Sequence, residues 1–356
     1  MPNLFDPLTI NRLELANRFV RSATMDSMAS GGLVTEPEIE LYRQLGKGEI
    51  GLIISHGLYP TKEGQCSPGQ LSAHSDEAIP SLKRLVDAVH QGGGKIAAQL
   101  LHGGWMCSRE VTGLEPVGPS QVVHPRSGAA IHELSSADIY ELADNYGRAA
   151  ARIVEAGFDG IQLHGAHSWL ISAFLSPATN KRNDIWGGSP HKRARFVREL
   201  YRAIRKVCGP NFPVLIKLGI RDYHPHGKTA AEGVQVAQLL EQDGFDAIEV
   251  SEGLEEDFFH HIRREAVTPY YLADCKEART NLRLPLILVG GMRSIKDMQA
   301  VLDEGTADAV SMCRPFVMNP HLVRDLRTGA TDGSQCTSCN ECMARMREGR
   351  LRCVLA

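Results

Sequence analysis

The sequence predicts an α/β protein of the (β/α)8 TIM-barrel class, and three observations support this class. Apolar, strand-like runs alternate with helix-like segments, the strand-like runs number eight, and one helix-to-strand passage recurs along the chain. A chain of 356 residues is long enough for one such barrel. The strand-like runs are Arg18–Ala23, Ile50–Gly57, Lys95–Leu101, Gly160–Leu163, Val214–Ile220, Ala247–Ser251, Leu286–Gly290 and Asp308–Met312.

Segments with helical periodicity lie between the strand-like runs. Ser136 and Ser294 stand where N-caps are expected, and Gly157 and Gly244 stand where helices should stop. The predicted helices are Glu36–Lys47, Asp76–Gln91, Ser136–Ala156, Pro190–Val207, Thr229–Asp243, Pro269–Asn281 and Ile295–Glu304.

The recurring passage ends a helix with glycine, turns through a short polar loop and enters a buried strand. Residues 156–161 return as residues 243–248 and, more loosely, as residues 304–310. An open doubly wound sheet is the alternative fold, but no Gly–x–Gly–x–x–Gly follows the first strand. We therefore expect a barrel over residues 1–330 and a cysteine-rich tail over residues 331–356.

Composition narrows the class of protein. The content of 43% apolar and 23% charged residues is ordinary for a globular chain, and the net charge of −3 argues against nucleic acid as a partner. No apolar run is long enough to span a bilayer, and the N-terminus does not read as a signal peptide. We expect a cytoplasmic protein with no membrane contact, whose nine cysteines are thiols or metal ligands rather than disulfides.

Polar and small residues follow the predicted strands, and in a barrel these positions share one face. Gly290 and Gly291 follow the seventh strand, and Arg314 follows the eighth. The loops after these two strands hold phosphate in many barrels, through backbone N–H groups and cationic side chains. The sequence thus favours a phosphate site, against the simpler interpretation of a turn and a surface charge.

Other strand ends suggest a flavin. Lys217 on the fifth strand can place positive charge where a reduced flavin becomes negative, and Gln99 can bind the pyrimidine edge. His164 and His167 follow the fourth strand, separated by small residues. Taken singly, these residues also fit a salt-bridged lysine, a satisfied core glutamine and a structural or metal-binding histidine pair.

Longer motifs resemble the old yellow enzyme family of FMN-dependent ene-reductases, over residues 4 to about 326. The matching stretches are Leu4–Leu8, Asn17–Val20, Gln99–Gly104, Ala156–Gly160, His164–His167, Phe174–Pro177, Asn180 and Trp186–Ser189.

The resemblance implies a TIM barrel with FMN at its carboxyl-terminal face and NAD(P)H as electron donor. It implies that His164 and His167 are catalytic and bind the carbonyl oxygen of an activated alkene, where two donors stabilise the enolate that forms on hydride transfer. The residues that it places around the flavin are Ala23, Thr24, Met25, Gly57, Gln99, Lys217, Gly290, Gly291, Cys313 and Arg314.

Three positions depart from the family pattern. Trp169 stands on the substrate side, where many members carry the tyrosine that protonates the α-carbon. Ser27 or a neighbour replaces a second tyrosine that some members use. Met25 stands where relatives carry a Cys, Thr or His that tunes the flavin. The proton donor is therefore open. Solvent is one candidate, and the side chains that we consider are Tyr59, Tyr223, His224, His260 and His261.

The tail carries Cys336, Cys339 and Cys342 as Cys–x–x–Cys–x–x–Cys, and Cys353 follows. Four thiolates suit a 4Fe–4S cluster or, alternatively, a structural zinc ion, with a redox disulfide as the simpler reading. The segment is similar to the corresponding region of bacterial 2,4-dienoyl-CoA reductase and trimethylamine dehydrogenase, although its third cysteine comes one residue earlier. The dispersed cysteines are read as core or loop residues: Cys66, Cys107, Cys208 and Cys275.

These features predict an FMN-dependent oxidoreductase that reduces a small, activated alkene. The chain stops before the second domain of the cysteine-containing relatives, so electrons would come from NAD(P)H directly or from a partner protein through the cluster. An amine demethylase or dehydrogenase that exports electrons through the cluster is the alternative enzyme, and a barrel that only binds FMN or zinc is the alternative of another class. A homo-oligomer is left open.

Overall fold

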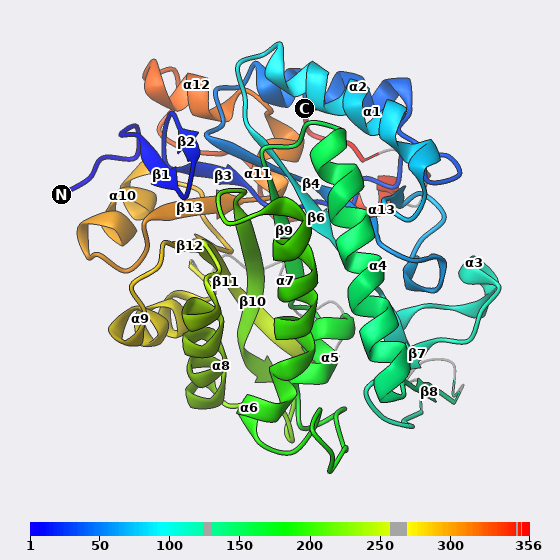
Figure 1. The fold of residues 1–356 in the computed structure, drawn as a ribbon. Helices are drawn as coiled ribbons and strands as arrows, with labels where there is room; N and C mark the ends of the chain where they lie inside the picture. Colours follow the sequence, from blue (N-terminus) through cyan, green and yellow to red (C-terminus); the bar gives the residue numbers. More distant parts are fainter. Residues whose placement is uncertain (124–127, 129, 257–268, 347, 350) are drawn as a thin grey trace.

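The molecule is a closed barrel of eight parallel strands with helices packed around it, which confirms the predicted (β/α)8 class (Figure 1). The structure, a computed structural model, describes the whole chain except residues 124–127, 129, 257–268, 347 and 350. The barrel closes because β3 pairs with both β13 and β4. In chain order its strands are β3 Phe19–Arg21, β4 Leu52–Tyr59, β6 Ile96–Leu100, β9 Gly160–Gly165, β10 Val214–Tyr223, β11 Ala247–Glu255, β12 Leu286–Val289 and β13 Ala309–Met312.

A hairpin that the sequence did not predict covers the amino-terminal end of the barrel. β1 (Leu8–Ile10) and β2 (Leu13–Leu15) pair antiparallel, and Ile10, Leu13 and Leu15 are buried. They belong to one apolar cluster with residues from seven of the eight strands: Val20, Leu52, Ile54, Ala97, Leu215, Ala247, Ile287 and Ala309. Aliphatic side chains fill this end of the barrel. We therefore expect the polar side chains that carry chemistry at the carboxyl-terminal end.

The predicted helices are present, with small shifts at their ends. The helices packed around the strands are α1 Glu36–Gly46, α2 Ile79–His90, α4 Ser136–Glu155, α7 Arg195–Cys208, α8 Ala230–Asp243, α9 Leu272–Asn281 and α10 Ile295–Asp303. Ser135, not Ser136, is the N-cap of α4, because Asp138 three residues later completes a capping box with it. The expected helix over residues 190–207 is divided at Ala194 into α6 (Pro190–Arg193) and α7.

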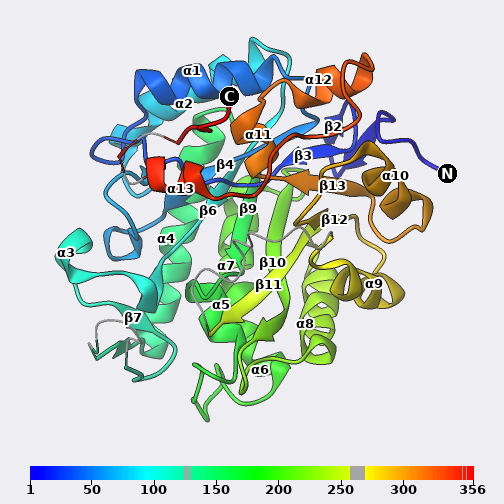
Figure 2. The same cartoon turned by 180° about the vertical axis from the view of Figure 1, so that it is seen from behind.

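Several short elements that connect or follow the barrel strands were not predicted. They are α3 Arg109–Thr112, β7 Val117–Gly118, β8 His132–Glu133, α5 Leu170–Leu175, α11 Arg314–Met318, α12 Leu322–Arg327 and α13 Glu341–Met346. Figure 2 shows α13, in red, in front of the barrel strands. None of the helices in the described part of the chain is long and apolar enough to cross a membrane.

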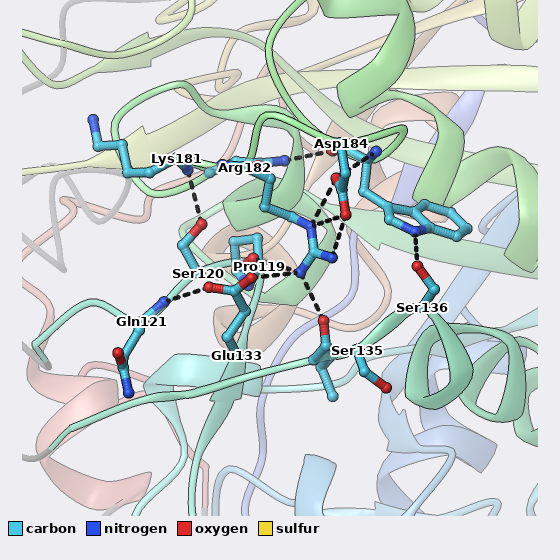
Figure 3. A network of polar contacts seen from close by, with 12 residues as sticks. Pro119, Ser120, Gln121, Glu133, Ser135, Ser136, Lys181, Arg182 and Asp184 are labelled. Atoms are coloured by element: carbon cyan, nitrogen blue, oxygen red, sulfur yellow. Dashed lines mark hydrogen bonds and ion pairs between the residues drawn. The ribbon is translucent and has the colours of Figure 1, made fainter.

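One buried arginine ties two of these connecting segments together (Figure 3). The Arg182 guanidinium donates to the carbonyls of Pro119 and Leu134 at 3.1 and 2.7 Å, and to Asp184 at 2.6 Å. Its side chain is 6% exposed. The planar group thus joins the excursion between β6 and α4 to the loop that follows α5.

We expect Arg182→Lys to lower the free energy of unfolding by about 2–3 kcal/mol, because an ammonium cannot reach both carbonyls and Asp184 at once. Urea unfolding measures this loss. The matched control is Arg109→Lys, since Arg109 forms a solvent-exposed ion pair with Glu115. Equal unfolding midpoints for the two variants would show that the Arg182 network contributes no more than a surface ion pair.

Candidate active site

A cavity of about 460 Å³ opens at the carboxyl-terminal ends of the barrel strands. All ten residues that the sequence analysis placed around a flavin line it, together with the three placed on the substrate side. These thirteen are Ala23, Thr24, Met25, Gly57, Gln99, His164, His167, Trp169, Lys217, Gly290, Gly291, Cys313 and Arg314. The fold therefore brings together residues that lie up to 291 positions apart in the chain.

The cavity also has walls that sequence reasoning did not find. Tyr270 and Arg293 line it, although neither belongs to a motif. The tail returns to it as well, through Cys342, Met343, Met346 and Leu351. Arg293 could have been suspected from its position two residues after the Gly290–Gly291 pair. Nothing local in the tail sequence signals that α13 packs over the barrel mouth.

A buried polar network lies under the cavity floor, around Glu249 on β11. The Glu249 carboxylate lies 3.2 Å from Lys217 Nζ and accepts hydrogen bonds from Gln162 at 2.9 Å and from Ser311 at 2.8 Å. Gln99 donates in turn to Gln162 at 2.8 Å. Lys217 is thus salt-bridged, as the simpler interpretation held, and it lines the cavity as well.

The charges of this network stabilise one another. Burial by itself raises the pKa of a carboxyl, but Lys217 and the hydrogen bonds to the carboxylate outweigh burial and hold the pKa of Glu249 below its ordinary value. Lys217 also donates to Ser22 Oγ at 2.9 Å. The ammonium is therefore fixed in position in the lining of the cavity.

The two histidines stand at right angles. Their ring centroids are 5.1 Å apart, with an interplanar angle of 89°. His164 is the last residue but one of β9, whereas His167 lies in the turn that follows. There His167 and Ser168 both have left-handed backbone conformations, with φ of 56° and 66°. The small residues between the histidines allow this sharp turn.

β11 holds the histidine turn in place. The amides of His167 and Ser168 donate to the carbonyls of Glu252 and Gly253 at 3.1 and 3.2 Å. The His167 ring lies 2.8 Å from Ser251 Oγ through Nε2. These contacts fix the orientation of the His167 ring and of the turn that carries it.

Trp169 lies beside this pair, with its ring 6.5 Å from that of His164. The indole of Trp105 donates to the Ser168 carbonyl at 2.6 Å and supports the same turn. An indole N–H does not release a proton near neutral pH, so Trp169 adds an apolar wall and no acid.

The opposite part of the cavity is glycine-rich and cationic. Gly290 and Gly291 have φ of 105° and 78°, and a Cβ on Gly290 would lie 2.9 Å from the Tyr270 ring. Both features require glycine. Arg314 and Arg293 line the same cavity, so two cationic side chains lie near this pair of glycines.

The proton-donor candidates do not converge on the cavity. Tyr59, Tyr223 and His224 are not among the described residues that line it. Tyr59 is buried elsewhere, with its ring stacked on His74. His260 and His261 lie outside the described residues.

The four tail cysteines come together, although they span 18 positions of sequence. Cys336, Cys339, Cys342 and Cys353 line one small cavity next to Arg314. Burial, together with the neighbouring thiols Cys313, Cys336 and Cys339, raises the pKa of Cys342 to about 11. Within the described chain, no three of these sulfurs lie within 4.8 Å of one another.

Two arginines fasten the tail to the cavity wall. Arg293 donates to the Cys336 carbonyl at 2.6 Å and to the Gly291 carbonyl at 3.1 Å, and it also bonds Ser338. Arg314 donates to Asn340 Oδ1 at 2.6 Å. Arg293 and Arg314, which lie in the loops predicted to bind phosphate, thus also contact the cysteine tail.

The remaining cysteines are less dispersed than expected. Cys66 and Cys107 both lie against Gly103, where an added Cβ would meet Cys107 Sγ at 2.5 Å and Cys66 Cβ at 3.0 Å. Cys66 also lines the main cavity. Since burial raises the pKa of both thiols, neither is a reactive thiolate in this structure.

The chain is similar in sequence and in fold to several known proteins. The chain is 34% identical over 348 residues to the NADH oxidase of Thermoanaerobacter brockii, which covers 95% of this chain and 53% of that protein. The structure of 2-naphthoyl-CoA reductase with 2-naphthoyl-CoA matches with a TM-score of 0.94 and 27% identity, over 99% of this chain and 57% of that one. The old yellow enzyme homologue from Zymomonas mobilis matches with a TM-score of 0.81 and 28% identity, over 94% and 95%.

The chain spans about half the length of several curated relatives that it matches. Residues 3–332 match the model of the NADH:flavin oxidoreductase / NADH oxidase family. With the barrel, the cavity and the old yellow enzyme neighbours in agreement, the chain belongs to this family, the old yellow enzyme family that its motifs indicated.

Proposed function

We propose that the protein is an FMN-dependent oxidoreductase that uses NAD(P)H to reduce a small alkene activated by a carbonyl or thioester group. The observation that carries the proposal is the preorganised His164–His167 pair, facing the same cavity as the Lys217 ammonium. Relatives whose names describe NADH oxidation and an acyl-CoA reduction support the reaction class. An amine dehydrogenase is the competing activity.

The cavity fits FMN in size and in chemistry. Its volume lies within the range of cofactor pockets, roughly 300–1,000 Å³. Gly290, Gly291, Arg293 and Arg314 would hold the phosphate, because side-chain-free backbone and two guanidinium groups meet there. Gln99 and Lys217 would hold the polar edge of the ring, and Gly57 would leave room for it, since a Cβ there would meet Leu101 at 2.9 Å.

Bound FMN supplies hydride transfer between a nicotinamide and the alkene carbon. The rest of the reaction rests on the protein. His164 and His167 would bind the substrate oxygen and stabilise the negative charge that develops on it. Lys217, held by Ser22 and Glu249, would keep positive charge at the cofactor's polar edge. Trp169 would seat the apolar part of the substrate.

An absorption spectrum and a turnover assay test this function. The purified protein should show flavin absorption and should oxidise NAD(P)H anaerobically when cyclohexenone is added. Methylated amines offered with an artificial electron acceptor serve as the competing assay. A colourless protein that cannot be reconstituted with FMN would contradict the proposal, whereas amine-dependent turnover alone would favour the dehydrogenase.

We further propose that residues 331–356 form a metal-binding tail in which Cys336, Cys339, Cys342 and Cys353 bind a 4Fe–4S cluster. The shared cavity of the four cysteines supports convergence on one group. Four thiolates are the ligand set of a 4Fe–4S cluster and equally of a structural zinc ion, which is the alternative. A cluster beside the flavin cavity would allow a partner protein to deliver or accept electrons.

Iron, sulfide and zinc analysis of anaerobically prepared protein decides between the two metals. Cys339→Ser should lose most of the bound metal, whereas Cys208→Ser, at the end of α7 and outside the cysteine cavity, should keep it. Since Arg314 contacts both the flavin cavity and the tail, we also expect Cys339→Ser to weaken FMN binding severalfold, measured by fluorescence titration. Zinc without iron or sulfide would contradict the cluster.

A further inference from the structure

Behind the cavity lies a group of buried titratable residues that the proposed mechanism leaves unused. Asp26, Glu38 and His56 each offer a ligand or proton-carrying atom, and these atoms all lie within 4.8 Å of one another. All three side chains are buried, at 0–1% exposure. Among the described residues, this is the one group of three or more such side chains packed so closely.

The position of the group connects it to the flavin cavity. Asp26 follows Met25 and His56 precedes Gly57, and both of those neighbours line the cavity, as does His56 itself. Glu38 comes from α1 on the outside of the barrel. The group therefore spans the layer between the cavity wall and the helix that covers it.

Its internal contacts suit a shared proton. His56 Nδ1 lies 3.1 Å from Asp26 Oδ1. Within the described part of the chain, the second Asp26 oxygen, both Glu38 oxygens and both His56 ring nitrogens have no hydrogen-bond partner. An imidazole can accept a proton on one nitrogen and release one from the other, so His56 can connect the carboxyl groups to the cavity.

The charged and titratable groups that the described residues place around the site come from β3 and α1. From β3, the buried Arg21 guanidinium lies over the Tyr42 ring at 5.2 Å and donates to the Ile54 carbonyl at 2.9 Å. From α1, the Tyr42 hydroxyl accepts from the His56 amide at 2.7 Å, and burial keeps the pKa of this phenol above its ordinary value. Arg21 is the cation that the described residues place beside this group.

The net charge of the buried group indicates whether it holds a proton or a divalent cation. One proton on Glu38 leaves Arg21 and Asp26 as the formal charges, and these cancel in a dry interior. A divalent cation bound by two ionised carboxylates would leave a net positive charge beside Arg21. In agreement, burial first and then Asp26 raise the pKa of Glu38 well above its ordinary value, and Arg21 and the Thr35 amide offset this only in part.

We propose that Asp26, Glu38 and His56 form a buried proton-storage site that gives up one proton to the flavin cavity for each alkene reduced. The proposal rests on the proposed function, and it supplies the proton that Trp169 cannot. The substrate gains a hydride through the cofactor on its β-carbon and a proton on its α-carbon. The O–H bond broken at Glu38 is reformed with a proton from solvent, the one proton that reduction of the alkene by NAD(P)H consumes overall, so no further reductant is needed.

Infrared spectroscopy tests the stored proton directly. The wild-type protein should show the C=O stretching band of a protonated carboxylic acid at neutral pH, and Glu38→Gln should lose it. The matched control is Glu40→Gln on the same helix, because Glu40 is exposed and paired with Arg43. This control should keep the band. The measurement needs no FMN.

Coupling to the cofactor is tested by counting protons. FMN-loaded protein is photoreduced anaerobically in weak buffer with a pH indicator, at pH values between about 4.3 and 9, the range between ordinary and strongly raised glutamate pKa values. Reduction adds negative charge near the site and should raise its affinity for protons. The wild type should therefore take up as much as one proton more per flavin than Glu38→Gln, within part of this range. Glu40→Gln should behave as the wild type.

Three outcomes would overturn the proposal. The carboxylic acid band could be absent from the wild type, the proton count could be the same in Glu38→Gln, or the wild type could hold a stoichiometric divalent metal that Glu38→Gln loses. If Glu38→Gln does not fold, the pH titration of the wild-type band and the proton count of His56→Gln replace it. Failure to bind FMN contradicts the proposed function, whereas bound FMN with an unchanged proton count contradicts only the storage site.

Discussion

Replacing either His164 or His167 by alanine is expected to slow alkene reduction by about 10²–10³, the usual loss when one preorganised donor to a developing oxyanion is removed. The two rings lie 5.1 Å apart and face one cavity, so we expect them to act on the same oxygen. The double variant should lose less than the product of the two single effects, because residues that act as a unit are not additive.

Stopped-flow kinetics separate this role from cofactor binding. Reoxidation of the reduced protein by cyclohexenone should slow by the stated factor, while its reduction by NAD(P)H and its flavin content should change far less. His191→Ala serves as the control, since His191 is exposed on α6. Equal losses in both half-reactions would instead mean that the histidines position the cofactor.

Lys217→Met is expected to destabilise the protein by about 3–5 kcal/mol, because it leaves Glu249 charged and unpaired in the barrel interior. In the wild type the pKa of Glu249 is lowered, so its contribution to stability is present above the ordinary carboxyl pKa and is lost as the pH falls through the lowered one. Without Lys217 the pKa of Glu249 should rise. The deficit of the variant should then shrink as the pH falls, because protonation removes the buried charge.

Urea unfolding of the variant at several pH values measures this effect. The double variant Lys217→Met with Glu249→Gln should recover much of the stability at neutral pH, since it buries no charge. It should not recover FMN binding, because the cation at the cofactor's polar edge is still missing. A double variant as unstable as Lys217→Met would place the cost in lost packing rather than in the charge of Glu249.

Much of the site was predictable because it depends on residues next to strand ends. Gln99, His164, Lys217 and Arg314 each follow or end an apolar run that is recognisable as a strand, and a parallel barrel gathers such positions at one end. The turn at Gly290 and Gly291 could also be predicted, since the left-handed backbone found there favours glycine. The boundaries of the strands were less accurate, most clearly at β10 and β11, which extend beyond their apolar runs.

Other parts of the site depend on partners that no local pattern reveals. Glu249 reads as one charged residue in a buried strand, and only the closed barrel surrounds it with Lys217, Gln162 and Ser311. Likewise Tyr59 was a reasonable proton donor by residue type, but its ring packs against His74 instead of facing the cavity.

By itself the sequence determined the barrel, its order of strands and the side of the barrel that carries the chemistry, because these follow from periodicity and from the short connections between elements. Only the tertiary structure decided that α1 buries Glu38 against Asp26 and His56, and that Arg293 and Arg314 fasten the cysteine tail beside the cavity. The physical reason is that protonation and electrostatic coupling depend on distance and burial, and both are set by contacts between residues far apart in the chain.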